Sequence, residues 1–159
     1  MAATQRDASS PVPWPPIIYG GAAVVAGIVS WLSAWPFEPT AGWFFIRIAG
    51  VCLIFAGIAL LMAAAAGFNR AKTPMPPTAP TKALVFGGIY RFTRNPMYLG
   101  MTSILAGLGL ALDQLWFLIA VPLALFAVTK LAIEREEAYL ARRFGAPYLE
   151  YKTKVRRWL

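Results

Sequence analysis

Four long apolar runs dominate the pattern of hydrophobic and polar positions in this chain. They cover residues 17–35, 43–68, about 97–112 and 115–133. The first run contains no charged residue, and nineteen helical residues reach roughly 28 Å, enough to cross the hydrocarbon core of a bilayer. Only Asp113 and Gln114 separate the last two runs, so the two helices must be antiparallel neighbours. The pattern predicts an all-α, polytopic membrane protein with about four transmembrane helices.

The polar segments divide the chain into three parts. Residues 1–16 are rich in proline and predict a flexible N-terminal lead-in, and residues 17–68 form a two-helix membrane hairpin. Residues 69–159 combine a proline-rich loop, a helical hairpin and an amphipathic tail. In that tail we expect one helix over 134–144, stopped by Gly145, and a second that begins near Pro147. Both tail helices are expected at the membrane interface.

Composition and charge support the membrane assignment. The 159 residues are 58% hydrophobic and 14% charged, with a mean hydropathy of +0.58, which is too apolar for an ordinary soluble domain. There is no histidine, and the single cysteine, Cys52, lies in an apolar run where a small buried side chain is expected. No metal site is therefore predicted, and the expected partners are membrane lipids rather than nucleic acid.

The distribution of Lys and Arg predicts the orientation. Five of the fifteen lie in residues 70–94 and eight in 130–157, whereas the links at 36–42 and 113–114 have none. With four spans, both basic segments face the same side, which the positive-inside rule makes cytoplasmic. We therefore expect both termini, and the segment before the third run, on the cytoplasmic side. Arg47 lies one turn inside the second run and is expected to anchor that helix at an interface.

A stretch rich in glycine, tyrosine and arginine precedes the third run. Residues 84–100 read LVFGGIYRFTRNPMYLG. Pro96 disfavours helical geometry at the residue before it, so we expect the helix to begin with Pro96 as its first residue. The free N–H groups of such a helix start, flanked by cations, suit an anionic or carboxylate-bearing ligand. A juxtamembrane loop whose arginines and tyrosines face lipid headgroups is the alternative interpretation, and these residues alone do not exclude it.

Two adjacent acids, Glu136 and Glu137, lie in the otherwise basic tail. An anionic membrane surface repels such acids, so an interfacial helix does not by itself account for them. Glu136 could pair with Arg143, Arg94 or Arg91, or it could hold a cationic ligand.

Residues 82–157 carry several motifs in order. They read GIYRFTRNPMYLG, then the apolar hairpin, then EREEAYL and RFGAPYLEYKTKV. This arrangement resembles the isoprenylcysteine carboxyl methyltransferases and the related phospholipid methyltransferases, a family of integral membrane enzymes that use S-adenosyl-L-methionine. The family pattern is G-x-Y-x-x-x-R-H-P-x-Y-x-G, an antiparallel hairpin, E-E-x-x-L and F-G-x-x-Y-x-x-Y. Each piece alone is weak, whereas the ordered set is specific.

The resemblance also implies which residues bind the methyl donor. They are Lys82, Ala83, Leu84, Val85, Tyr90, Asn95, Pro96, Met97, Tyr98, Glu136 and Glu137. Asn95 replaces the usual histidine of the family, although its amide can still hydrogen-bond a carboxylate or a ribose hydroxyl. Ala132 stands where the eukaryotic prenylcysteine enzymes carry an arginine for the substrate carboxylate, which argues against that substrate. No catalytic base is assigned.

Methyl transfer from this donor matches the residue types in the motifs. A sulfonium zwitterion needs a carboxylate, a group that binds its own carboxylate, and apolar or aromatic surface around its adenine. The reaction is a direct displacement that mainly requires alignment and exclusion of water. The expected acceptor is lipophilic or small, either a thiol, a carboxylate or a lipid amine, and the residues do not distinguish these.

A noncatalytic or transport-related small membrane protein is the alternative. Proton-coupled transport usually requires an acid within a span. The four predicted spans contain none, because Glu38 and Asp113 fall in turns. The ordered motifs therefore favour a membrane methyltransferase.

Overall fold

The computed structural model describes residues 12–33, 42–75 and 79–159. Within these ranges the all-α expectation is confirmed: three helices are long and apolar enough to cross a membrane, and a fourth apolar helix, α3, is shorter. The helices are α1 (Trp14–Leu32), α2 (Trp43–Arg70), α3 (Pro96–Ala111), α4 (Leu115–Val128), α5 (Glu134–Phe144) and α6 (Ala146–Lys154). A short 3₁₀ turn, η1 (Gly88–Arg91), precedes α3, and a π-helical segment, η2 (Thr129–Ile133), joins α4 to α5.

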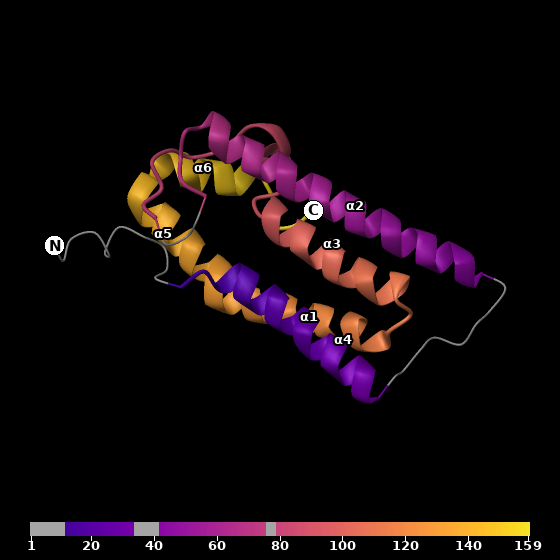
Figure 1. Ribbon diagram of the computed structural model, residues 1–159. Helices are drawn as coiled ribbons and strands as arrows, with labels where there is room; N and C mark the ends of the chain where they lie inside the picture. The colour runs from indigo at the N-terminus through magenta and orange to yellow at the C-terminus, as the bar shows by residue number, and fades with distance from the viewer. Residues whose placement is uncertain (1–11, 34–41, 76–78) are drawn as a thin grey trace.

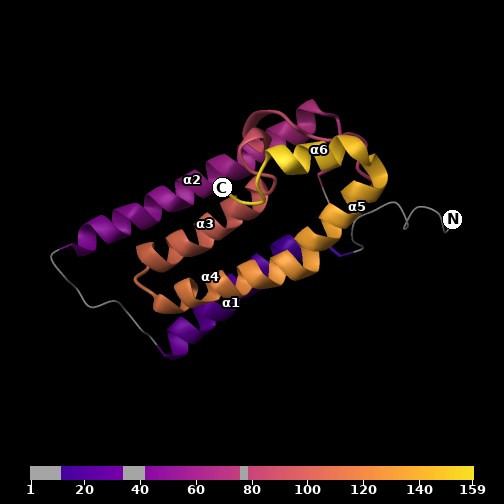
Figure 2. The ribbon, with the colours of Figure 1, turned by 180° about the vertical axis from the view of Figure 1, so that it is seen from behind.

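The long helices form two side-by-side pairs. Figure 1 shows α2 beside α3 and α1 beside α4, and the reverse view in Figure 2 agrees. The end of α2, the start of α3 and helices α5 and α6 gather at one end of the bundle. That end brings together the two segments singled out in the sequence, the stretch before α3 and the twin glutamates of α5.

Helices α2 and α3 pack so closely that their backbones are in contact. A Cβ atom placed on Gly57 would lie 2.6 Å from the carbonyl oxygen of Gly100, and one on Gly107 would lie 2.6 Å from that of Gly50. Both helices carry these glycines seven residues apart, so they recur on one face. In lipid the hydrophobic effect does not drive helices together, so their association depends on close van der Waals packing, which small residues allow.

The other pair is held by larger side chains. Tyr19 of α1 and Phe117, Ala124 and Val128 of α4 belong to one buried cluster. The hydroxyl of Tyr19 lies 2.7 Å from Thr102 Oγ1, so a hydrogen bond ties α1 to α3 within the bundle. The hydroxyl of Thr102 donates its own hydrogen to the carbonyl oxygen of Tyr98 over 2.8 Å. In the bond between Tyr19 and Thr102, the hydroxyl of Tyr19 is therefore the donor.

The fourth run continues into the tail without a break. Residues Leu115–Phe144 form one continuous helix that includes the wider turn of η2. Gly145, at φ 59°, stops it and lets α6 fold back. The expected helix starts at Pro96 and near Pro147, and the stop at Gly145, are confirmed.

Several details differ from the sequence-based expectation. Helix α1 begins at Trp14, so the lead-in ends before residue 16, and residues 1–11 lie outside the described part. Trp35 and most of the first link also lie outside it. Cys52 is exposed on α2 rather than buried. Arg47, expected as an interface anchor, is about half exposed and pairs with Asp113 in the turn between α3 and α4.

Candidate functional site

A cavity of about 370 Å³ lies at the end of the bundle where α3 begins. All but one of the predicted site residues line it: Ala83, Leu84, Val85, Tyr90, Asn95, Pro96, Met97, Tyr98, Glu136 and Glu137. Lys82 lies outside this lining, and its backbone N–H donates to Thr73 Oγ1 over 2.8 Å. Residues from the extended segment, from α3 and from α5 therefore share one space of the size that proteins use for small ligands.

The two motif halves make direct contact at the cavity wall. The hydroxyl of Tyr98 in α3 donates to Oε2 of Glu136 in α5 over 2.7 Å. Among the described residues, no ion pair involves Glu136. Of the two alternatives for Glu136, the ion pair with Arg143, Arg94 or Arg91 is therefore not the one found there, because Arg94 pairs with the neighbouring Glu137 and Arg143 donates to the carbonyl of Thr81.

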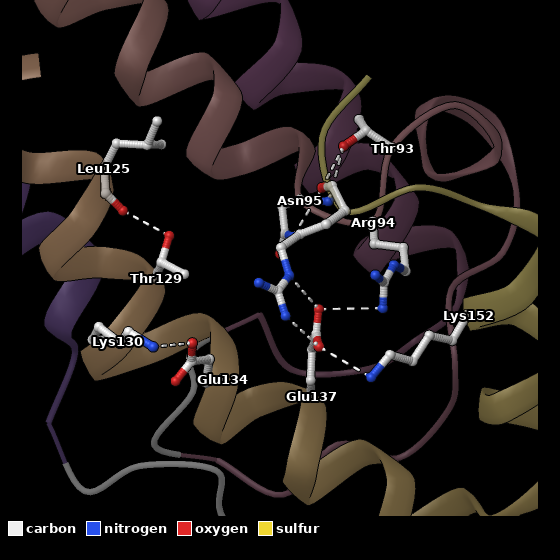
Figure 3. Close-up of polar contacts among 10 residues, drawn as sticks. Thr93, Arg94, Asn95, Leu125, Thr129, Lys130, Glu134, Glu137 and Lys152 are labelled. Atoms are coloured by element: carbon white, nitrogen blue, oxygen red, sulfur yellow. Dashed lines mark hydrogen bonds and ion pairs between the residues drawn. The ribbon is translucent and has the colours of Figure 1, made fainter. Parts of the chain in front are cut away.

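Glu137 is surrounded by positive charge. Its carboxylate oxygens lie 3.2 Å from Arg94 Nη1, 3.3 Å from Lys152 Nζ and 3.0 Å from two nitrogens of Arg157. Figure 3 shows the carboxylate of Glu137 in contact with Arg94, from the segment before α3, and with Lys152, from α6. One acid thus links three separate segments, and three cations against one anion leave this side of the cavity electropositive.

The start of α3 contributes polar groups as well. The side chain of Arg94 is 11% exposed, and its Nε has no hydrogen-bond partner within the described parts of the chain. The side-chain amide nitrogen of Asn95, Nδ2, donates to the backbone carbonyl of Arg157 over 3.0 Å. Pro96 follows as the first residue of the helix, so the free N–H groups of its first turn lie at the same wall.

Aromatic side chains form much of the remaining wall. Tyr90, Tyr148 and Tyr151 line the cavity together with Phe68, whose ring meets that of Tyr90 edge to face at 5.8 Å. The hydroxyl of Tyr151 donates to the carbonyl of Tyr90 over 2.7 Å. Burial raises the pKa of Tyr151 to about 12 and also raises that of Tyr90, so both phenols are neutral at physiological pH.

The apolar part of the cavity wall was not predicted from the sequence. It includes Pro13, Pro15 and Pro16 at the start of α1, Met101 of α3 and Ile133 of η2. Two adjacent prolines are typical of the first turn of a helix, so Pro15 and Pro16 would have predicted that α1 begins a few residues before residue 17. Nothing in the sequence of α1 indicates that this turn faces the segment before α3.

The structure thus defines a polytopic α-helical membrane protein with a mixed polar and aromatic cavity at one end. Residues 45–147 match the family model of phospholipid methyltransferases. The chain therefore belongs to the phospholipid methyltransferase family, as the resemblance of its motifs predicted. Membership implies a membrane methyltransferase, and the family generally uses S-adenosylmethionine.

Two curated proteins are similar to this chain. An uncharacterized protein of Haemophilus influenzae is 40% identical over 63 residues, which are 40% of this chain and the whole of that protein. The human protein-S-isoprenylcysteine O-methyltransferase is 29% identical over 139 residues, 82% of this chain and 48% of the human protein. The chain thus spans about half the length of the human enzyme. No solved structure matches it.

Proposed function

We propose that the protein is an S-adenosyl-L-methionine-dependent integral membrane methyltransferase that binds its donor in the cavity between α3 and α5. The observation that carries the proposal is the hydrogen bond between Tyr98 and Glu136 at the cavity wall, because it joins the two motif halves at one place. Family membership supports the reaction class, and the lining of the cavity supports its location.

The lining suits each part of the donor. Glu136 is a carboxylate without a cationic partner among the described residues, so it can hold the amino group or a ribose hydroxyl. The guanidinium of Arg94, whose Nε has no hydrogen-bond partner among the described residues, and the N–H groups of the first turn of α3 suit the carboxylate of the donor. The neutral phenols of Tyr90 and Tyr151 offer surface for the adenine and the sulfonium.

The chemistry that the donor supplies when bound is an electrophilic methyl group for a direct displacement. The residues of the chain bind and orient, and their apolar and aromatic walls exclude water. No side chain has to act as a strong base if the acceptor is a thiolate, a carboxylate or a neutral amine. We therefore assign no catalytic base.

The proposed acceptor is a lipophilic or small molecule that reaches the apolar wall. Met101, Ile133 and the prolines at the start of α1 provide that wall, on helices that would border lipid. Ala132, which is buried in η2, supplies no cation for the carboxylate of a prenylcysteine. A thiol, another carboxylate or a lipid amine fits these residues, and the distribution of Lys and Arg supports a site on the cytoplasmic side.

Donor binding by the purified full chain tests the proposal. Calorimetry with S-adenosyl-L-methionine should show saturable binding, and Glu136→Gln should weaken it about tenfold or more, because a charged hydrogen bond is lost. Glu134→Gln is the matched control, since Glu134 lies on the same helix and pairs with the exposed Lys130 over 2.7 Å. Absence of binding by the wild-type protein would overturn the proposal, and so would equal binding by wild type and Glu136→Gln.

Methyl transfer is tested separately. Membranes that contain the protein should consume labelled donor when supplied with lipid extracts or small thiols, and mass spectrometry would identify the product. A noncatalytic or transport-related protein would leave the labelled donor unchanged under all these conditions, which would overturn the assignment as an enzyme.

A further inference from the structure

The chain after α6 returns to the start of α3. Val155 is extended, at φ −120° and ψ 129°, and in Figure 1 the C-terminus lies beside the first turn of α3. The backbone N–H of Arg94 donates to the carbonyl of Arg156 over 3.0 Å. Trp158 packs against the buried cluster of the bundle. We call residues 155–158 the C-terminal strap.

The backbone carbonyl of Arg157 in the strap holds the segment before α3. It accepts one hydrogen bond from Thr93 Oγ1 over 3.1 Å and another from Asn95 Nδ2 over 3.0 Å. Thr93 is completely buried, and its oxygen also accepts the backbone N–H of Asn95 over 3.2 Å. Both lone-pair directions of the carbonyl are thus used, and the residue before Pro96 is fixed by its backbone and by its side chain.

The side chain of the same residue holds the other wall. Arg157 donates through Nε and Nη2 to the two oxygens of Glu137, each over 3.0 Å, which is the two-pronged geometry of a strong arginine–carboxylate pair. This hydrogen bond raises the pKa of Arg157, so the pair stays charged. One residue of the strap therefore connects the start of α3, through its backbone, to the twin glutamates, through its side chain.

We propose that the C-terminal strap sets the spacing of the two donor-binding walls, with Thr93 and Arg157 as positioning residues. The proposal rests on the proposed function of the cavity. Neither Thr93 nor Arg157 lines the cavity, so any effect of these residues on a bound donor passes through Asn95 and Glu137, which do. Loss of the strap contacts leaves the polar composition of the cavity unchanged and loosens its geometry.

Thr93→Val is the sharpest test because it is nearly isosteric and removes only the hydroxyl. We expect the dissociation constant for S-adenosyl-L-methionine to rise about three- to tenfold, since each buried hydrogen bond contributes on the order of 1 kcal/mol. Without donor, hydrogen exchange at residues 94–98 should become faster. The control Thr129→Val removes a hydroxyl that bonds to the carbonyl of Leu125 in its own helix over 2.7 Å, and both readouts should stay at wild-type values.

A second set of variants separates positioning from mere stability. Arg157→Ala should raise the KM for the donor about tenfold, and Arg157→Lys should restore part of this because it keeps the charge but not the two-pronged geometry. Arg156→Ala removes an exposed charge from the same strap and should leave the KM unchanged. A stabilising role alone would lower the melting temperature of Arg157→Ala without changing the KM.

The two proposals fail in different ways. Absence of donor binding by the wild-type protein would overturn the proposed function, while the exchange experiment would still measure the strap. Unchanged exchange at residues 94–98 in Thr93→Val would show that the strap does not hold that segment. Faster exchange with a wild-type donor affinity would show that the strap is a stability element only, and either result would overturn this proposal.

Discussion

The α2–α3 pair and the cavity end of the molecule are held together by opposite means. Between α2 and α3 the backbones are in contact. At Gly57 and Gly100 the contacts involve backbone atoms and apolar side chains, and no polar side chain takes part. At the cavity end, the segment before α3, helix α5 and the strap are joined by the ion pairs of Glu137 and by hydrogen bonds to Arg157. The first region depends on shape and the second on charge and hydrogen bonding.

This difference reflects the solvents that the two regions meet. Lipid tails are as apolar as the helix surfaces, so α2 and α3 gain from close packing rather than from removal of apolar area from water. Where water competes for polar groups, a cluster persists if several contacts share one buried acid, as they do at Glu137. Changes of shape should therefore damage the first region most, and changes of charge the second.

The largest effect is expected from Gly57→Leu. A side chain at this position meets the backbone of Gly100 and the side chain of Ile104, so the helices must separate. Overpacking of this kind costs about 3 kcal/mol or more. Thermal unfolding of the protein in detergent micelles measures it. Gly42→Leu, at a position with open space around the Cβ, is the control, and equal melting temperatures for the two variants would contradict the packing argument.

Glu137→Gln should have an intermediate effect. It leaves Arg94, Lys152 and Arg157 facing one another without the carboxylate that neutralises them. We expect a loss of about 2 kcal/mol in the free energy of unfolding, because two of the three cations keep partial access to water. Chemical denaturation in micelles measures the loss. Glu150→Gln, which breaks an exposed pair with Lys154, should cost far less, and the reverse order would contradict the clustered role of Glu137.

The smallest effect is expected from Arg47→Met. Arg47 pairs with Asp113 at the far end of α2 and α3, but its side chain is 54% exposed, so solvent screens the pair. The expected loss of stability is small, well below that of Gly57→Leu. The same unfolding assay measures it. A loss as large as that of Gly57→Leu would show that charge, rather than shape, holds the α2–α3 pair.

The sequence predicts elements better than it predicts contacts. The hydrophobic runs and the prolines define the helices, because lipid-length apolar segments and the geometry of Pro96 are local properties. The motif residues other than Lys82 also line one cavity, and donor binding by them stays a prediction. The bounds of the helices depend on short stretches of chain, whereas the meeting of residues 83–98 with Glu136 and Glu137 depends on the fold.

The partners of the twin glutamates could not be predicted in the same way. Adjacent helical residues point about 100° apart, so Glu136 and Glu137 face different surroundings, and only the packing of α5 decides which of them meets Tyr98. The contacts of the strap could not be predicted from the sequence either, because its hydrogen bonds to Thr93 and Asn95 use a backbone carbonyl, which every residue has.

The unbroken helix from Leu115 to Phe144 has a consequence for where chemistry takes place. It carries Glu136 roughly 32 Å along its axis from Leu115. A hydrocarbon core is about 30 Å thick. The distance from Leu115 to Glu136 therefore matches the thickness of the hydrocarbon core. If the first turn of this helix lies at one edge of the lipid tails, Glu136 lies at the other edge, where a water-soluble molecule and a lipid can meet.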